Sequence, residues 1–375
     1  MAELLEWPSA VDFWSVVQRA ADALGQGRLV AFPTETVYGI AAYVFAPEAV
    51  ERLVHVKGRP EEKPLTLALV HGAQATDWVP QLSRIGRRLA RRCWPGPLTL
   101  VCGDGVREGL MTRLPEPVQR RLCPAGMLGL RVPDHDAIRH VMQLLGGPLV
   151  LTSANRSGGT AAVDAGHVLE AVGEGVDLVI DGGPSRYGRA STVVEVNGST
   201  WRVLREGVLS REELERQSAY EIVFVCTGNT CRSPLAEALC KKRLAERLGC
   251  APADLPRHGF AVQSAGLAAM IGDRAAPEAI DVGHDLGVDL TSHVSQPLTA
   301  ELVARADLLV VMTQAHLAGV LMRYPGSETP IRLLCGDGND VPDPIGCDEG
   351  VYRECAQQIS ASLERLLIDF DSGLI

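Results

Sequence analysis

The chain has 375 residues and a mass of 40.1 kDa, and at roughly 150 residues per domain this length predicts two or three domains. Hydrophobic residues make up 46% and charged residues 22%, an ordinary globular composition that excludes disorder as the main state. The formal net charge of −10 argues against capture of nucleic acid by charge alone. No run of about 18 apolar residues occurs, which excludes a membrane-spanning helix.

The N-terminal segment and the cysteines indicate a cellular location. The first residues are acidic and lack the basic start of a secretory signal, so we expect a cytoplasmic protein. The ten cysteines are scattered and form no C-x-x-C pair, so we expect no metal site built from protein ligands and mostly reduced, buried thiols.

The first half of the chain alternates helical and strand-like segments. Residues 9–25 predict a helix, residues 28–33 a strand and residues 46–56 a second helix. Further strands, with helices between them, are expected at residues 65–70, 98–103, 128–133, 148–153, 177–181 and 191–196. We therefore expect a first α/β domain that covers residues 1–209.

Residues 208–220 are polar and predict a helix without a partner strand, so we place a linker at residues 210–219. The second domain is then residues 220–375.

The second domain shows a simpler alternation of strands and helices. Residues 221–226 are a continuous apolar run, typical of a strand buried on both faces, and residues 234–249 predict a helix. Strand patterns recur at residues 261–266, 306–312 and 331–335. This order predicts a doubly wound parallel sheet of four strands with helices on both faces.

The strongest chemical signal is the segment VCTGNTCRSP at residues 225–234. A buried strand ends at Cys226, a loop with Gly228 follows, and a helix begins near Ser233, so backbone N–H groups and a helix dipole point at one place. This field favours the thiolate of Cys226, and Arg232 adds a planar fork for an oxyanion. The same spacing recurs from Cys347 to Arg353, but Asp348 and Glu349 would repel a phosphate there, which favours a surface helix.

A cysteine nucleophile that attacks phosphorus also needs an acid to protonate the leaving group. Asp343 follows the strand at 331–335, and the ends of parallel strands gather at one edge of the sheet. A solvated acidic turn is an equally good interpretation, because Asp337, Asp340 and Asp348 lie nearby.

Residues 220–372 resemble the low-molecular-weight protein tyrosine phosphatase family through VCTGNTCRSPLAEAL, SAGL at 264–267, ADLLVVMT and DVPDPIG. The resemblance implies that Cys226 is the nucleophile, Arg232 the transition-state clamp and Asp343 the general acid, with no cofactor. It also implies a phosphate loop formed by Thr227, Gly228, Asn229, Thr230, Cys231 and Ser233. Cys231 is either the partner of a reversible protective disulfide or a buried thiol.

The preferred substrate depends on two positions in this second domain. Thr230 replaces the aliphatic residue of tyrosine-specific members, and TGNTCRSP is similar to the protein-arginine-phosphatase branch. Ile345 replaces an aromatic residue after Asp-Pro and removes a stacking wall for a phenyl ring. We favour phosphoarginine over phosphotyrosine in a phosphoprotein substrate, and phosphotyrosine stays open.

The first domain carries short motifs near its expected strand ends. They lie at residues 33–39, 57–60, 95–99, 131–133, 151–158 and 181–194. Several combine hydroxylated residues with a cation, as recognition of phosphate or carboxylate requires. Each motif alone also fits an ordinary turn.

In this order, the motifs resemble the threonylcarbamoyl-AMP synthase (YrdC-like) family over residues 10–209. The resemblance implies a twisted, open, mixed α/β sheet. It also implies formation of threonylcarbamoyl-AMP from L-threonine, bicarbonate and ATP, with Mg²⁺ sharing the phosphate charge, and delivery of this product to tRNA-modification machinery. Lys57, Arg59, Ser153, Asn155, Ser191 and Arg205 are the candidates for ATP binding. Thr34, Tyr38, Arg131 and Thr152 are the candidates for threonine binding.

One helical pattern has an open interpretation. Arg84, Arg87, Arg88, Arg91 and Arg92 fall on one helical stripe, which is either a solvated face or, less favoured, a docking face for RNA or an acidic partner.

For the whole chain we expect a bifunctional enzyme. The alternative is a nucleotide-binding or RNA-binding sensor whose phosphatase-like module is a redox-sensitive docking element.

Overall fold

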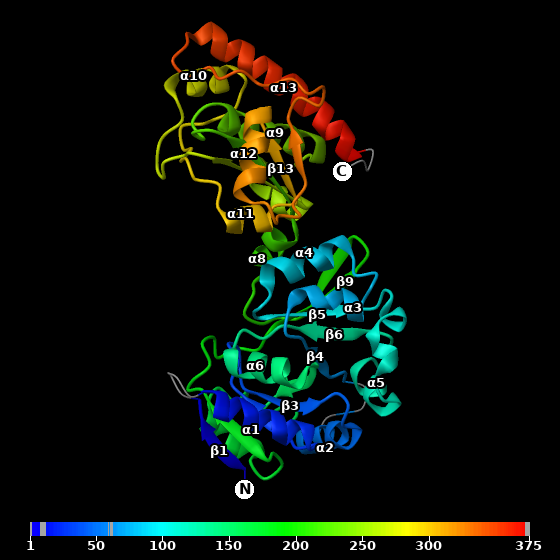
Figure 1. The fold of residues 1–375 in the computed structure, drawn as a ribbon. Helices are drawn as coiled ribbons and strands as arrows, with labels where there is room; N and C mark the ends of the chain where they lie inside the picture. The colour runs from blue at the N-terminus through cyan, green and yellow to red at the C-terminus, as the bar shows by residue number, and fades with distance from the viewer. Residues whose placement is uncertain (1, 8–12, 59, 61–62, 372–375) are drawn as a thin grey trace. The chain divides into compact units, whose positions relative to one another are not determined.

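The computed structural model describes residues 2–7, 13–58, 60 and 63–371, and the chain divides into two compact units, Met1–Gln217 and Ser218–Ile375 (Figure 1). Each unit is described by itself. Within the described part of the chain, no helix is both long enough and apolar enough to span a membrane.

The N-terminal unit is built on one ten-stranded sheet in the order β1-β8-β2-β3-β7-β4-β6-β5-β9-β10. Its strands are β1 (Glu3–Glu6), β2 (Val30–Phe32), β3 (Gly39–Tyr43), β4 (Thr66–Ala68), β5 (Leu98–Cys102), β6 (Leu128–Arg131), β7 (Leu149–Ser153), β8 (Leu178–Asp181), β9 (Thr192–Asn197) and β10 (Thr200–Arg205). The sheet contains parallel pairs such as β4–β6 and antiparallel pairs such as β3–β7, so the predicted open, mixed sheet is confirmed.

Three of these strands, β1, β3 and β10, were not predicted from the sequence patterns. The segment of β3, GIAAY, is rich in small residues and lacks the β-branched run that marks a strand. The strands β1 and β10 lie at the two edges of the sheet, where each pairs with one neighbour and carries mostly exposed residues. Tertiary pairing therefore decides these three elements.

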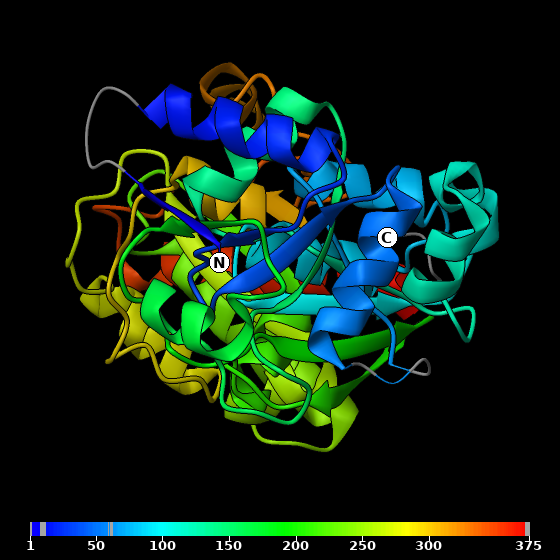
Figure 2. The same ribbon diagram turned by 90° about the horizontal axis from the view of Figure 1, so that it is seen from below.

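Helices cover both faces of this sheet. Those of the N-terminal unit are α1 (Phe13–Gly25), α2 (Pro47–Lys57), α3 (Ala75–Trp78), α4 (Arg84–Cys93), α5 (Glu116–Leu122), α6 (Asp136–Leu145), α7 (Ala165–Val172) and α8 (Arg211–Ser218), with short 3₁₀ turns η1 (Gly72–Gln74), η2 (Val106–Glu108) and η3 (Leu110–Arg113). In β2, Val30 and Phe32 pack with α1 and α6, whereas Ala31 packs into the core on the opposite face. The two helices α1 and α6 lie side by side on their face (Figures 1 and 2).

The arginine-rich helix α4 is only partly the solvated stripe that its sequence indicated. Arg84, Arg87 and Arg91 are exposed, but Arg88 is buried, because it lies next to Leu89 and one turn after Ile85, at the edge of the apolar face. Arg92 and Arg87 instead bond to backbone carbonyls of the N-terminal unit.

The helix predicted within 208–220 is α8, which packs on the core of the N-terminal unit through Leu214.

The C-terminal unit has a four-stranded, all-parallel sheet in the order β12-β11-β13-β14, as predicted. Its strands are β11 (Tyr220–Cys226), β12 (Phe260–Gly266), β13 (Leu308–Val311) and β14 (Ile331–Leu333). Its helices are α9 (Arg232–Leu248), η4 (Pro252–His258), α10 (Pro277–Asp285), α11 (Ala300–Arg305), α12 (Gln314–Arg323) and α13 (Glu349–Asp371). The central strand β11 sends Phe224 to the core under α9, α10 and α13, and Val223 and Val225 to the core under α11 and α12.

The central position of Phe224 allows a test of this packing. Phe224 is fully buried, so we expect Phe224→Ala to lower the free energy of unfolding of the C-terminal unit by about 3–5 kcal/mol, measured by urea denaturation. The matched control is Met322→Ala in α12, where the side chain is 81% exposed and the expected change is within about 0.5 kcal/mol. Equal effects of the two substitutions would contradict the assigned core.

Candidate active sites

The C-terminal site is built where β11 ends and α9 begins. Cys226 is the last residue of β11 and Arg232 the first residue of α9, so residues 227–231 form a short loop at the helix N-terminus. The buried Sγ of Cys226 lies 2.9 Å from Oγ of Ser233, and the backbone N–H of Asn229 donates to it at 3.2 Å. These contacts place hydrogen-bonding groups around the Sγ of Cys226, the candidate nucleophile of the sequence analysis.

Asn229 fixes the shape of this loop. It has a positive φ of 56° and is fully buried. Its amide donates to Oγ of Ser233 at 3.0 Å and to Oγ of Ser264 at 2.8 Å, and its Oδ1 accepts from the backbone N–H of Gln296 at 2.9 Å. Glu237 accepts from Ser264 in turn, so the loop is tied to α9, β12 and the segment before α11.

Arg232 and Asp343 meet at the mouth of the same loop. Arg232 is 4% exposed; its Nη2 donates to Oδ2 of Asp343 at 2.5 Å and its Nη1 to the carbonyl of Val341 at 3.1 Å. The Nε of Arg232 is buried and has no hydrogen-bond partner among the described residues. A buried donor without a partner is costly, so this edge of the guanidinium is suited to an anionic ligand.

Cys231 is a second buried thiol of the loop. Its Sγ lies 3.4 Å from the hydroxyl of Tyr352 and 3.6 Å from Oγ1 of Thr230, and burial raises its pKa. The thiol is free in this structure. Whether it pairs with Cys226 on oxidation stays a prediction.

The loop also has partners that the sequence reasoning missed. Thr227 Oγ1 lies 2.9 Å from Nε2 of His316, and the Nε2 of His293 lies 2.8 Å from the carbonyl of Asn229. Histidine had no distinguishing motif in the sequence, because its partners come from elements far apart along the chain.

The second Cys-to-Arg spacing is not a site. Cys347 is exposed, and Arg353 on α13 pairs with Glu349 and Asp285 at the surface. The predicted surface helix is confirmed.

The N-terminal site is a pocket of about 460 Å³ on one face of the sheet. Of the candidate residues, those that line it are Thr34, Tyr38, Arg131, Thr152, Ser153, Ser191 and Arg205. Every second residue of β5 and β6 contributes, because alternate side chains of a strand point to the same face, and β7 contributes its last three residues, 151–153. The structure therefore brings together all four threonine candidates and three of the ATP candidates.

Arg131 is the best defined cation in this pocket. It is 7% exposed and its Nη2 donates to Oε1 of Glu35 at 2.8 Å and to Oγ1 of Thr36 at 2.7 Å. Glu35 is itself fixed by the backbone N–H of Asp134 at 3.0 Å. The buried Nε of Arg131 has no partner among the described residues, which leaves a donor for a ligand anion.

Tyr38 and Thr34 are both held by local hydrogen bonds. The Tyr38 hydroxyl donates to the carbonyl of Gly183 at 2.8 Å, and burial raises its pKa to about 12, so it stays protonated at neutral pH. Thr34 Oγ1 donates to the carbonyl of Val37 at 2.7 Å.

Lys57 contacts the Ser153–Asn155 turn from outside the pocket. It is 2% exposed and its Nζ donates to the carbonyl of Ser153 at 2.7 Å and to Oδ1 of Asn155 at 3.0 Å. Neither Lys57 nor Asn155 is among the residues that line the pocket. Arg59 lies outside the described residues.

Ser191 and Arg205 close the other side of the pocket. Arg205 Nη2 donates to the carbonyl of Ser191 at 2.8 Å, and Thr99 Oγ1 lies 2.9 Å from Ser191 Oγ. Burial, and then the nearby Arg131, lower the pKa of Arg205. Two cations of this kind on one pocket face attract an anionic ligand.

The donors of this pocket do not form a cage for a metal ion. The described residues contain no cluster of three His, Cys, Asp or Glu side chains. Mg²⁺ is commonly held by one or two carboxylates together with substrate phosphates, so the predicted Mg²⁺ would depend on the nucleotide for most of its ligands.

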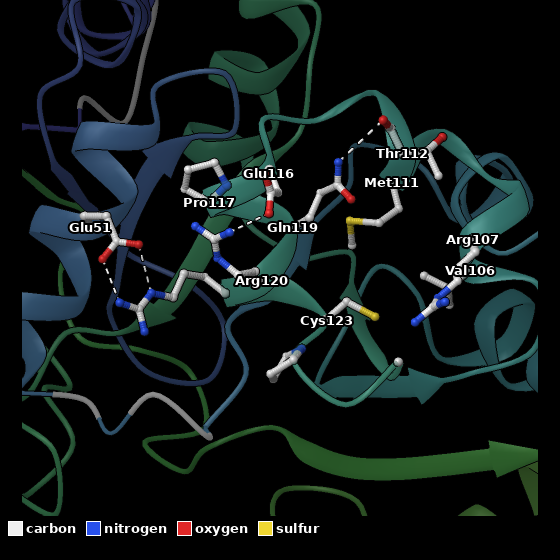
Figure 3. Close-up of a pocket in the computed structure, with 13 residues that line it drawn as sticks. Glu51, Val106, Arg107, Met111, Thr112, Glu116, Pro117, Gln119, Arg120 and Cys123 are labelled. Atoms are coloured by element: carbon white, nitrogen blue, oxygen red, sulfur yellow. Dashed lines mark hydrogen bonds and ion pairs between the residues drawn. The ribbon is translucent and has the colours of Figure 1, made fainter.

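A second cavity, of about 800 Å³, lies among α2, η2, η3 and α5 (Figure 3). Glu51 pairs with Arg121 and Glu116 with Arg120 at its rim, and Met111 and Cys123 are among the residues that line it. It contains none of the predicted site residues.

Two family models match the chain. The model described as telomere recombination, which groups Sua5, YciO and YrdC, matches residues 22–207. The model described as low molecular weight phosphotyrosine protein phosphatase matches residues 221–372. The chain therefore belongs to the YrdC/Sua5 threonylcarbamoyl-AMP synthase family through its N-terminal unit and to the low-molecular-weight phosphatase family through its C-terminal unit.

Individual relatives agree with this division. A threonylcarbamoyl-AMP synthase from Chromohalobacter salexigens is 35% identical over 184 residues, 49% of this chain and 94% of the relative. The protein-arginine-phosphatase of Bacillus subtilis is 37% identical over 150 residues, 39% of this chain and 93% of the relative.

Longer relatives match only in part. The threonylcarbamoyl-AMP synthase of Pyrococcus abyssi is 34% identical over 208 residues, 55% of this chain, and the match spans 58% of the relative's length. The solved structure of a Sua5 variant from P. abyssi has a TM-score of 0.52 at 23% identity, covering 96% of this chain and 97% of that one, which supports the fold alone.

The strained backbone of Asn229 leads to a testable prediction. Asn229→Gly removes the side-chain hydrogen bonds and leaves buried partners unpaired, so we expect a loss of about 2–4 kcal/mol in the free energy of unfolding of the C-terminal unit. Asn229→Ala should lose about 1 kcal/mol more, because alanine tolerates the positive φ less well than glycine. Urea denaturation of both variants measures the difference; an alanine variant as stable as the glycine variant would refute the strain.

Proposed function

We propose that the N-terminal unit synthesises threonylcarbamoyl-AMP from L-threonine, bicarbonate and ATP in the cytoplasm, for transfer to tRNA-modification machinery. The observation that carries this proposal is Arg131, a buried guanidinium with an unpartnered Nε at a pocket of suitable size. The family membership of residues 22–207 supports the same reaction.

In this proposal Arg131 binds the carboxylate of threonine, and Glu35 holds the guanidinium in place through Nη2. Thr34, Tyr38 and Thr152 surround the rest of the amino acid. The threonine amine attacks bicarbonate to give a carbamate with loss of water, and the carbamate oxygen then attacks the α-phosphate of ATP and displaces pyrophosphate.

ATP would lie against the second cation of the pocket. Ser153, Ser191 and Arg205 provide hydroxyl and guanidinium donors, and Lys57 holds the Ser153–Asn155 turn in position from behind. Arg59 is assigned to the phosphates by family resemblance. Mg²⁺, when bound, would neutralise phosphate charge.

Arg131→Gln tests the amino-acid site. We expect the KM for threonine to rise by about 10–100-fold, since a hydrogen bond to a charged group contributes about 1.5–3 kcal/mol. The measurement is pyrophosphate release that requires threonine, bicarbonate and ATP together. Arg107→Gln, in the separate second cavity, is the matched control and should leave this KM unchanged. An unchanged KM in Arg131→Gln would exclude the assigned carboxylate site.

We propose that the C-terminal unit hydrolyses protein phosphoarginine through a phosphocysteine intermediate. The supporting observation is the loop at residues 226–232, which combines a buried thiol with a guanidinium whose Nε is unpartnered. The Cys226 thiolate attacks phosphorus, and the bond to the leaving nitrogen breaks as Asp343 donates a proton. A water molecule, deprotonated by Asp343, then hydrolyses the S–P bond and releases orthophosphate.

The preference for phosphoarginine is supported by two side chains in and beside the loop at residues 226–232. Ile345, next to the acid loop, is 66% exposed and has no aromatic face on which a phenyl ring could stack. Thr230 presents a hydroxyl in the loop. The relative that is 37% identical is named a protein-arginine-phosphatase.

Cys226→Ser tests the nucleophile. We expect hydrolysis of an aryl phosphate and of both phosphoamino acids to be lost, because serine is not ionised at neutral pH, while threonine-dependent pyrophosphate release is retained. Cys347→Ser, at an exposed thiol, is the control and should keep full activity. For the native chain we expect kcat/KM on phosphoarginine to exceed that on phosphotyrosine by at least about tenfold. The opposite order would exclude the arginine preference and leave the nucleophile unaffected.

A further inference from the structure

A buried histidine connects the phosphate loop to the start of α12. His316 is 6% exposed and lies between two threonine hydroxyls. Its Nδ1 is 3.0 Å from Oγ1 of Thr313, the N-cap of α12, and its Nε2 is 2.9 Å from Oγ1 of Thr227, which directly follows Cys226. No step of the proposed reaction uses this chain of three side chains.

The imidazole is neutral near pH 7. Burial, and then the positive charge of Arg232, lower the pKa of His316, whereas Asp343 and Asp340 act in the opposite direction. A neutral imidazole has one donor nitrogen and one acceptor nitrogen, so the two threonines must have different roles.

The hydrogen bonds of Thr313 indicate which threonine donates to the imidazole and which accepts from it. Thr313 Oγ1 already accepts the backbone N–H of His316 at 3.1 Å, and its own hydroxyl proton is then available to donate to Nδ1. This arrangement favours the tautomer with the ring proton on Nε2, which then donates to Thr227 Oγ1. In the opposite tautomer, Oγ1 of the half-buried Thr313 would accept two hydrogen bonds, and its own proton would have no protein acceptor among the described residues.

The consequence concerns Thr227. Because its oxygen accepts from His316, its hydroxyl proton is free to donate, and no other side-chain partner for this hydroxyl occurs among the described residues. The backbone is also fixed, since the carbonyl of Thr227 accepts from the N–H of Ala268 at 2.9 Å. An exposed, oriented O–H next to the nucleophile suits an oxyanion.

We propose that His316 is a positioning residue that, as the Nε2–H tautomer, directs the hydroxyl proton of Thr227 to an oxygen of the bound phosphoryl group. This inference rests on the proposed phosphatase function and adds to its loop one donor that the backbone alone does not supply.

The first experiment determines the tautomer in the native full-length chain. ¹⁵N-labelled histidine and long-range ¹H–¹⁵N correlation spectra at pH 7.5, with His316→Gln to assign the signals, should show the proton on Nε2. A proton on Nδ1, or a doubly protonated ring, would overturn the proposal without any activity assay.

The second experiment is a double-mutant cycle with orthophosphate as the probe. Thr227→Val and His316→Gln should each raise the inhibition constant of orthophosphate by about tenfold, and the double variant should be no weaker than Thr227→Val, because both remove the same donor. Thr227→Ser keeps the hydroxyl and should retain nearly native binding. Multiplicative losses in the double variant would show a merely structural histidine and overturn the proposal.

Two controls separate this inference from the proposed function. His284→Gln, at an exposed histidine of α10, should leave both binding and hydrolysis unchanged. If the native chain hydrolyses aryl phosphate but all variants bind orthophosphate equally, only the role of His316 fails. If the native chain does not hydrolyse aryl phosphate at all, the proposed phosphatase function fails first, and the inference fails with it.

Discussion

Both units depend on the burial of a positive charge at the end of a strand. Arg131 ends β6, Arg232 follows β11 across the loop, and both are less than a tenth exposed. Burying a guanidinium costs several kcal/mol unless other groups compensate its charge, and Glu35 and Asp343 do so here. In each case the carboxylate occupies one part of the guanidinium and leaves Nε without a protein partner. The burial that makes each guanidinium costly to accommodate therefore also leaves it with an Nε donor whose hydrogen bond an anionic ligand can accept.

The scaffolds that hold the two guanidinium groups differ. In the C-terminal unit, a parallel sheet brings β11 and its neighbours to one edge, where a single loop and a helix N-terminus form the site. In the N-terminal unit, the site lies on a face of the sheet and takes residues from several strands. A compact oxyanion needs one loop, whereas the proposed ligands of the N-terminal unit, threonine and ATP, together need a broad surface.

Rigid support behind each site is a second common feature. Lys57 is buried and fixes the Ser153–Asn155 turn from behind, and Asn229 links the phosphate loop to β12 and α9. Neither side chain needs to touch a substrate to matter. Their hydrogen bonds keep the groups that do so in one geometry, which lowers the cost of ordering the site when a ligand binds.

The sequence by itself determined the two α/β units, the positions of most strands along the chain and the loop between Cys226 and Arg232, because these depend on local patterns of apolar and small residues. Arg131, Ser153 and Ser191 were selected through the resemblance to the synthase family, and the structure shows that all three line one pocket. Only the tertiary structure decided that β1, β3 and β10 join the sheet, that Arg88 is buried, and that Lys57 supports the pocket from behind. Glu35 and His316 were likewise beyond the sequence, because their roles arise from contacts between residues about 90 positions apart, and such contacts leave no pattern along the chain.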